Sequence, residues 1–469
     1  MAIFFFFVGI IYLKYIISFF LKNNIIKFLL GVLAFPTLVF APFAIFLVKR
    51  IFLYSSYKDE IFEVIGSFGF NLNWLIAIFS FVFFLRFVPK LWIFDYKNKT
   101  TNINNVFLKV HFPFKLVLIV FGIEFLLAFG DLLYTFLTNT NEFLYDRDSF
   151  AAEQEAELLS RGRGVFSFLW SILQSAKFIL ISHIINIQKF KKVYNLTQFK
   201  IIIFTFFGTS LITYLIQLSS TSSRIGMVLP LVIIFFQYKF IFSDLPIRLN
   251  NMKFRIIYLL YAVILFSLPV LFSILSFFRK GVTAAEGSFN FLLNSLHGLG
   301  GFMTISEFAV IYSQIRSQTL NFEFGYSFFL DFIQFVPRFI YPDKPITSFS
   351  YRLSQKIYDL SYDNPSTWVH TFTPWGEGYL QFSSIGVIMA SILLVILITL
   401  AINFVNKYKI FTFNFLFIFL PTFITTFRAD LSSGFGRFYE FFFFSMLGYF
   451  FLIAILQFIP LSKAKIVRN

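Results

Sequence analysis

Arginine and lysine residues recur between residues 224 and 437, at positions where a phosphate group could be bound. Guanidinium groups bind phosphate oxygens through two parallel hydrogen bonds, whereas the lysine ammonium acts as a point charge. The cations are Arg224, Arg316, Arg338, Lys344, Arg352, Lys356, Arg428 and Arg437. They could instead pair with carboxylates or with ordinary lipid phosphates, but an exposed ion pair contributes at most about 1 kcal/mol. The pattern therefore favours a site for a phosphate-bearing substrate.

The segment "WGEGYLQF" adds a carboxylate to these cations. Glycines on both sides of Glu377 allow a close backbone approach or a positive φ. Trp375 and Tyr379 supply aromatic faces suited to a membrane interface or to sugars. Glu377 is either a general base or a group that orients an arginine or supports the structure. His370 could also accept a proton, although it could equally be a solvated loop histidine.

Other kinds of site have no support in the sequence. The chain contains no cysteine and four histidines (His111, His183, His297 and His370), which lack the spacing of metal ligands. We find no phosphate-binding glycine loop, no D-x-D metal motif and no Ser-His-Asp set. We therefore expect neither a metal nor another cofactor.

The elements that must position these residues are membrane helices. The chain is 58% hydrophobic with a mean hydropathy of +0.79, and apolar runs of about 20 residues recur, each long enough to cross a bilayer. The fold class is therefore all-α, a polytopic membrane protein of about eleven spans. These are 2–21, 28–48, 71–88, 116–138, 165–187, 201–218, 225–243, 256–278, 384–405, 410–427 and 438–458.

Charge asymmetry between alternate loops predicts the orientation. One side carries most of the lysine and arginine residues with only Asp95 and Asp244, and the other side carries most of the acids. By the positive-inside rule the C-terminus is cytoplasmic and the loop 279–383 is external. The net charge of +16 thus reflects orientation and not a nucleic-acid partner. An odd number of spans puts the N-terminus outside as well.

The external loop divides the chain into residues 1–278 with eight spans, the loop 279–383, and residues 384–469 with three spans and a cytoplasmic tail. Three short helices are expected in the loop, lying on the outer membrane surface. One opens with a capping box at Thr304 and Glu307 and runs to Arg316. Another covers Tyr326 to Val336, and a third, Phe349 to Leu360, places Arg352 and Lys356 on one face.

Two charged residues lie inside predicted spans at matching depth. Glu124 lies about nine residues, and Lys177 about ten, from the cytoplasmic ends of neighbouring antiparallel spans. We expect their side chains to meet in the membrane interior. The pair would either fix the register of the two helices or relay a proton.

The layout and several short motifs resemble the bacterial O-antigen and oligosaccharide repeat-unit polymerases. The motifs are P-R-x-x-x-P-x-K-P from Pro337 to Pro345, G-E-x-Y-x-x-F-x-x-x-G from Gly376 to Gly386, "SSR" at Ser222 to Arg224 and "RAD" at Arg428 to Asp430. The chain departs from the family at Ser383, where glycine is usual.

The resemblance implies an enzyme of the outer face of the bacterial inner membrane. Such an enzyme transfers an undecaprenyl-diphosphate-linked glycan to a hydroxyl of another lipid-linked repeat unit. Arg338, Arg428, Glu377 and His370 would be catalytic. Arg224, Arg316, Lys344, Arg437, Trp375 and Tyr379 would bind the diphosphate or the glycan, and a chain-length regulator protein is an implied partner. A ligase using the same lipid donor, and a flippase or other polysaccharide transporter, remain as alternatives.

Overall fold

The computed structural model describes part of the chain, and every regular element in that part is helical. The described residues are 2–21, 26–27, 30–31, 34, 38–39, 63–90, 112–138, 163–191, 193–221, 301–333, 341, 349–358, 372–420, 423, 426–428 and 430–458. The all-α prediction is therefore confirmed for these residues.

The helices fall into two compact units. The first contains α1 (Ala2–Leu21), α5 (Phe68–Leu85), α14 (Gly301–Arg316), α15 (Tyr326–Ile333), α16 (Phe349–Tyr358), most of α17 (Pro374–Lys407), η4 (Thr426–Arg428) and the start of α20 (Leu431–Phe458). The second contains α7 (Phe114–Thr138), α9 (Arg163–Lys191), α10 (Leu196–Thr221), η2 (Lys409–Phe411), α18 (Thr412–Asn414), η3 (Phe415–Phe419) and the rest of α20.

Four helices among the described residues are long and apolar enough to cross a membrane. They are Phe68–Leu85, Phe168–Ile185, Pro374–Lys407 and Leu431–Gln457, and they overlap the predicted spans 71–88, 165–187, 384–405 and 438–458. Described helical segments also overlap the predictions 2–21, 116–138, 201–218 and 410–427. Spans 225–243 and 256–278, and most of 28–48, lie outside the described residues.

Helix α17 reverses direction near its start. Phe382 (φ −144°, ψ 31°) and Ser383 (φ 55°, ψ −140°) are not helical, and the indole of Trp375 donates to Ser391 Oγ at 2.9 Å. Sixteen residues of straight helix would separate those two residues by about 24 Å. The short arm 374–381 therefore folds back on the long arm 384–407, which begins where the ninth span was predicted to begin.

Among the described residues, α14, α15 and α16 lie in the predicted external loop, and one detail of the prediction is wrong. Helix α14 does end at Arg316, but it already includes Gly301, so Thr304 lies inside the helix and cannot cap its start. The apolar pair Phe302 and Met303 continues the helix toward its N-terminus. Helices α15 and α16 lie within the two predicted amphipathic stretches.

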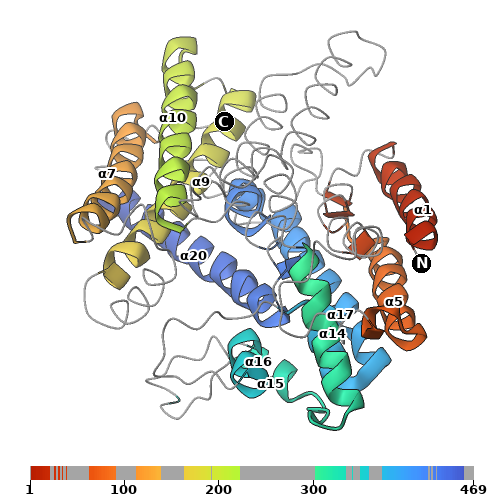
Figure 1. The fold of residues 1–469 in the computed structure, drawn as a ribbon. Helices are drawn as coiled ribbons and strands as arrows, with labels where there is room; N and C mark the ends of the chain where they lie inside the picture. Colours follow the sequence, from red (N-terminus) through yellow and green to blue (C-terminus); the bar gives the residue numbers. More distant parts are fainter. Residues whose placement is uncertain are drawn as a thin grey trace, which may run out of the picture. The chain divides into compact units, whose positions relative to one another are not determined.

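The predicted ion pair in the second unit is confirmed. In that unit α7 packs against both α9 and α10 (Figure 1). Lys177 Nζ on α9 lies 2.7 Å from Glu124 Oε2 on α7, and both side chains are buried. The indole of Trp170 donates to the other carboxylate oxygen, Oε1, at 3.2 Å. The pair is therefore a fully enclosed polar contact between two apolar helices.

Candidate functional site

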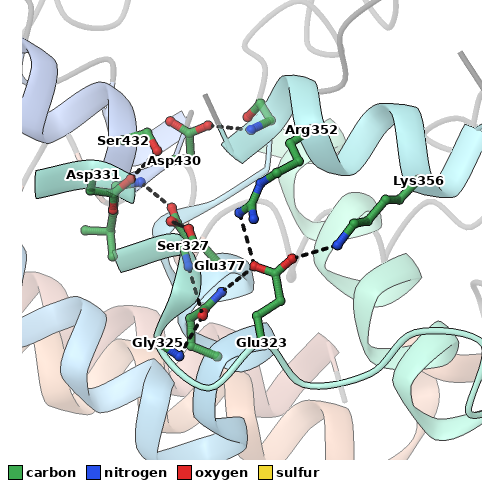
Figure 2. Close-up of polar contacts among 12 residues, drawn as sticks. Glu323, Gly325, Ser327, Asp331, Arg352, Lys356, Glu377, Asp430 and Ser432 are labelled. Carbon is green, nitrogen blue, oxygen red and sulfur yellow. Dashed lines mark hydrogen bonds and ion pairs between the residues drawn. The ribbon is translucent and has the colours of Figure 1, made fainter. Parts of the chain in front are cut away.

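Three buried carboxyl groups meet in the first unit, and we refer to Asp331, Glu377 and Asp430 as the carboxyl cluster (Figure 2). They come from α15, from the short arm of α17 and from the residue before α20. None of the three residues is more than 1% exposed. Burying one ionised carboxylate is costly without partners, so the hydrogen bonds of each member determine what the cluster can do.

Glu377 joins two other segments to the short arm of α17. Thr373 starts this arm, with its hydroxyl accepting from Gly376 N at 2.9 Å. Glu377 Oε2 then accepts a hydrogen bond from the backbone N–H of Leu431 at 2.8 Å, at the first turn of α20. Its Oε1 accepts from the hydroxyl of Ser327 on α15 (Figure 2). Both oxygens of Glu377 are therefore occupied by donors.

Asp331 has one satisfied oxygen and one unsatisfied oxygen. Its Oδ1 accepts from the hydroxyl of Ser432, whereas the buried Oδ2 has no hydrogen-bond donor. Burial raises the pKa of Asp331 well above its usual value, and the negative charge of Asp430 raises it further, while the hydrogen bond from Ser432 opposes the rise. A hydrogen bond with Glu377 and the positive charge of Arg352 also oppose the rise. Burial raises the pKa of Glu377 as well, and the negative charges of Asp331 and Asp430 raise it further.

Asp430 is surrounded by donors and caps α20. Its Oδ1 accepts from the backbone N–H and the hydroxyl of Ser433, at 2.8 and 2.7 Å. Its Oδ2 accepts from the backbone N–H of Ser350 at 2.8 Å, which ties α16 to the same place. An aspartate at the N-cap satisfies backbone N–H donors that have no partner within the helix.

A second polar group lies beside the cluster and contains two cations. Glu323 accepts from Arg352 Nη2 at 3.1 Å, from Lys356 Nζ at 3.0 Å and from Gln381 Nε2 at 3.0 Å (Figure 2). The prediction that Arg352 and Lys356 share one face of a helix is thus confirmed. Gln381 Oε1 in turn accepts from Gly325 N at 2.9 Å, so the loop before α15 is fixed to the short arm of α17.

The guanidinium group of Arg352 has N–H donors without a hydrogen-bond partner. Its Nε and Nη1 atoms are buried and have no hydrogen-bond partner. The group lies over the rings of Tyr326 and Phe349, 5.1 and 5.8 Å from their centroids, and Glu323 holds its third nitrogen. A mostly buried cation fixed in this way, with unused N–H groups, is suited to binding an oxyanion.

The predicted aromatic site residues lie in the core. Trp375 is fully buried and stacks on Phe427, with 6.4 Å between the ring centroids. Tyr379 is 8% exposed and packs against Phe308 and Tyr312. In this structure both rings support the short arm of α17.

Of the predicted basic residues, Arg316 is exposed at the end of α14, and Arg437 is partly buried on α20. The backbone of Arg428 lies in η4, two residues before Asp430. The side chain of Arg428, together with Arg224, Arg338, Lys344 and His370, lies outside what the structure describes. The predicted convergence of Arg224, Arg338 and Arg428 therefore stays a prediction.

Sequence reasoning overlooked Glu323, Asp331 and Gln381 and did not give Asp430 a role of its own. Asp331 did carry a signal, because it is the only charged residue in the otherwise apolar helix "YSFFLDFI". It also lies four positions after Ser327, on the same helical face, and both residues are buried. An acid on the buried face of a short helix could have been marked as a site residue.

No group of histidine and carboxylate side chains in the described part of the chain is arranged to hold a metal ion. Comparison of the chain with protein-family models, curated proteins and solved structures finds no match.

Proposed function

We propose that this protein polymerises lipid-linked oligosaccharide repeat units on the outer face of a bacterial inner membrane. The observation that carries the proposal is the contact between two segments that resemble the polymerase family. Glu377 of the G-E-x-Y segment accepts a hydrogen bond from Leu431, next to Asp430 of the "RAD" segment. Helices α15 and α16 of the predicted external loop contribute Ser327 and Ser350 to the same polar region.

We also propose how the chain crosses the membrane. The chain would have about eleven spans, with a cytoplasmic C-terminus and the loop 279–383 outside. Four long apolar helices support a membrane protein in general. Under this arrangement the carboxyl cluster and the Glu323 group would lie where the loop meets the external ends of the spans.

The reaction would use fixed cations and would not need a nucleotide-activated sugar. The acceptor hydroxyl oxygen attacks the anomeric carbon of the donor glycan, and the bond from that carbon to the diphosphate oxygen breaks. Undecaprenyl diphosphate leaves with the bonding electrons, and a base receives the hydroxyl proton. Preorganised cations stabilise the developing charge on the leaving group. Arg338 and Arg428 are the proposed catalytic cations, and Arg352, with its two unpartnered nitrogens, is a further candidate.

Glu377 and His370 are the two candidates for the base. Glu377 is fully buried and both of its oxygens accept hydrogen bonds. That environment supports a role in holding the site together, which leaves His370 as the candidate for proton transfer. The proposal does not need Glu377 to touch a substrate.

One observation favours a different function. The Glu124–Lys177 pair lies within the predicted spans 116–138 and 165–187, and a transporter or flippase would place polar groups midway through its spans. A ligase that uses the same lipid donor would share the proposed cation site.

The test is a set of variants in a bacterial strain that lacks the gene. Complementation with wild type should restore a ladder of long glycans, whereas Arg338→Ala and Arg428→Ala should give chains of one or two repeats at equal protein level. The corresponding Arg→Lys variants should rescue only partly, because lysine cannot form the two parallel bonds. The matched control is Lys200→Ala, which removes an exposed cation of α10 and should leave the ladder intact.

Three outcomes would contradict the proposal. Near-normal ladders in both arginine variants would show that these residues are ordinary surface charges. Complete loss of attached glycan on deletion of the gene, with long chains still present on the lipid carrier, would identify a ligase. Accumulation of unpolymerised units on the cytoplasmic side would identify a flippase.

A further inference from the structure

We propose that α15 binds the membrane surface: one face of the helix lies in lipid, while the opposite face contributes to the carboxyl cluster. The lipid-binding side chains, which we call the aromatic face, are Phe324, Tyr326, Phe329 and Phe332. The sequence predicted that this stretch lies on the outer membrane surface, and the structure adds which side chains face lipid and which face protein. The inference concerns a contact with the bilayer, so it does not rest on the proposed transfer of glycans.

Helix α15 has polar side chains on its buried face and aromatic side chains on its exposed face. Ser327 and Asp331, one turn apart, are at most 1% exposed. Their hydrogen bonds with Glu377 and Ser432 lie inside the protein (Figure 2). The exposed fractions of the aromatic face are 75% for Phe324, 47% for Tyr326, 58% for Phe329 and 50% for Phe332. A helix at a water-exposed surface has the reverse distribution, with its apolar residues inward.

The chemistry of the aromatic face fits lipid better than water. Contact between apolar rings and water is unfavourable in proportion to the exposed area, and an exposed apolar patch marks a surface that binds something. Asp331 is the only charged residue of α15, and it is fully buried. The exposed face of the helix therefore offers no charge to water or to a charged partner. Tyrosine, at the edge of this face, is a residue that favours the boundary between lipid and water.

Helix α15 lies where two helices that are long and apolar enough to cross a membrane begin. The ring of Phe328 packs against that of Phe382, at the start of the long arm of α17, with 6.2 Å between the centroids. The ring of Phe332 packs against that of Phe435, in the first turns of α20, with 4.9 Å between the centroids. Ile385, in the first turn of the long arm, is itself 67% exposed. Exposed apolar side chains therefore continue from α15 onto a helix that could cross the membrane.

Helix α5 runs parallel to the long arm of α17, so its start lies at the same end of the first unit. Ser384 donates to Asn73 Oδ1 at 2.7 Å, and the hydroxyls of Ser391 and Ser80 lie 2.8 Å apart. The second pair is seven residues, about two helical turns, beyond the first on both helices. The starts of α5, the long arm and α20 thus lie on the side where α15 is found. A helix at that level would lie where head groups meet acyl chains, on the external side under the proposed orientation.

The consequence is a defined position for the carboxyl cluster relative to the bilayer. Ser327 and Asp331 reach the cluster from one face of α15, and the aromatic face lies on the other. An α-helix with its side chains is about 10–12 Å in diameter. The cluster would therefore lie about one helix diameter from lipid, and binding of α15 to the bilayer would hold it at that depth.

The experiment measures what surrounds each face in the full-length protein, reconstituted into vesicles of phosphatidylethanolamine and phosphatidylglycerol. The chain contains no cysteine, so Phe329→Cys and Phe332→Cys each accept a single nitroxide label. Electron paramagnetic resonance then measures collisions of the label with oxygen, which dissolves in lipid, and with a water-soluble nickel complex. One matched control is Phe79→Cys, at a 54% exposed ring in the middle of α5. The other is Ser317→Cys, at an exposed polar residue directly after α14.

We expect the ratio of oxygen to nickel collisions at Phe329 and Phe332 to be several times that at Ser317 and to approach that at Phe79. Both side chains are exposed, so their replacement should leave the unfolding temperature close to that of wild type. A ratio as low as that at Ser317 would overturn the inference, because the aromatic face would then lie in water. Few collisions with either reagent would also overturn it, because protein would then cover this face. Spin–spin broadening between labels would in that case identify a second copy of the chain as the cover.

Discussion

Gly378 and Gly386 lie backbone against backbone where the two arms of α17 meet. A Cβ atom on Gly378 would overlap the carbonyl group of Gly386, and one on Gly386 would overlap the carbonyl group of Gly378. The turn at Ser383 brings them together. Glu377 lies next to Gly378, so this close contact also fixes where its carboxylate points.

Alanine at either glycine should destabilise the protein. Overpacking of this kind costs about 3 kcal/mol where backbone and not a flexible side chain must move. We expect Gly378→Ala and Gly386→Ala to lower the folded yield and the unfolding temperature, measured by intrinsic fluorescence in detergent. Gly208 in α10 has no atom within 4 Å of a built Cβ, so Gly208→Ala should be neutral or slightly stabilising. Equal stability in all three variants would show that the arms of α17 do not meet.

Ser383 has a backbone conformation that favours glycine. Its φ is 55° with ψ −140°, and such a conformation costs a residue with a side chain about 1–3 kcal/mol. A glycine at this position would adopt the same conformation without that cost. Ser383→Gly relieves this strain but also removes the hydrogen bond between Ser383 and Tyr379, so it should change the free energy of unfolding by less than about 1 kcal/mol.

The control for Ser383→Gly is the same substitution at the neighbouring residue, Ser384→Gly. Ser384 begins the long arm, and its hydroxyl donates to Asn73 Oδ1 at 2.7 Å. Ser384→Gly should lower the unfolding temperature, because it removes that bond and adds a flexible residue to a helix. A loss of stability in both variants would argue against the strained turn.

The effects of Lys177 and Glu124 on the stability of the fold should depend on each other. Glu124→Gln leaves a buried ammonium without a counter-charge, which costs about 3–5 kcal/mol. The double variant Glu124→Gln with Lys177→Met removes both charges and keeps an acceptor for Trp170, so it should recover most of that loss. Thermal unfolding of the wild type, both single variants and the double variant measures the coupling. Additive losses would mean that the pair does not interact.

The same double variant separates a structural ion pair from a proton relay. If the pair only fixes helix register, a well-folded double variant should still restore the glycan ladder in cells. Loss of the ladder at a normal protein level and unfolding temperature would instead support the relay, and with it the transporter alternative.

Arg352 should contribute to activity more than to folding. Removing one fixed cation from a site of developing charge costs about 10²- to 10³-fold in rate, so Arg352→Ala should shorten the glycan chains strongly. Arg352→Lys keeps a positive charge for Glu323 but supplies fewer fixed donors, and it should recover only part of the length. Lys200→Ala again provides the comparison. Long chains in Arg352→Ala at equal protein level would rule out a role in binding the diphosphate.

Several features of this protein follow from the sequence because helix geometry converts spacing into position. Apolar runs located the four described helices that are long and apolar enough to cross a membrane, since about 20 residues of helix are needed to cross a bilayer. Matched depth in neighbouring spans predicted the contact between Glu124 and Lys177. The i,i+4 spacing of Arg352 and Lys356 predicted that they share a face, and both reach Glu323.

Only the tertiary structure identified the reversal of α17 and the carboxyl cluster. The reversal depends on the dihedral angles of two residues, Phe382 and Ser383, and the apolar pattern continues through them without a break. The cluster joins Asp331, Glu377 and Asp430, which are far apart along the chain. The donors that hold Asp331, Glu377 and Asp430 come from other helices. Sequence spacing fixes neighbours within one helix, whereas these contacts exist only once separate helices have packed together.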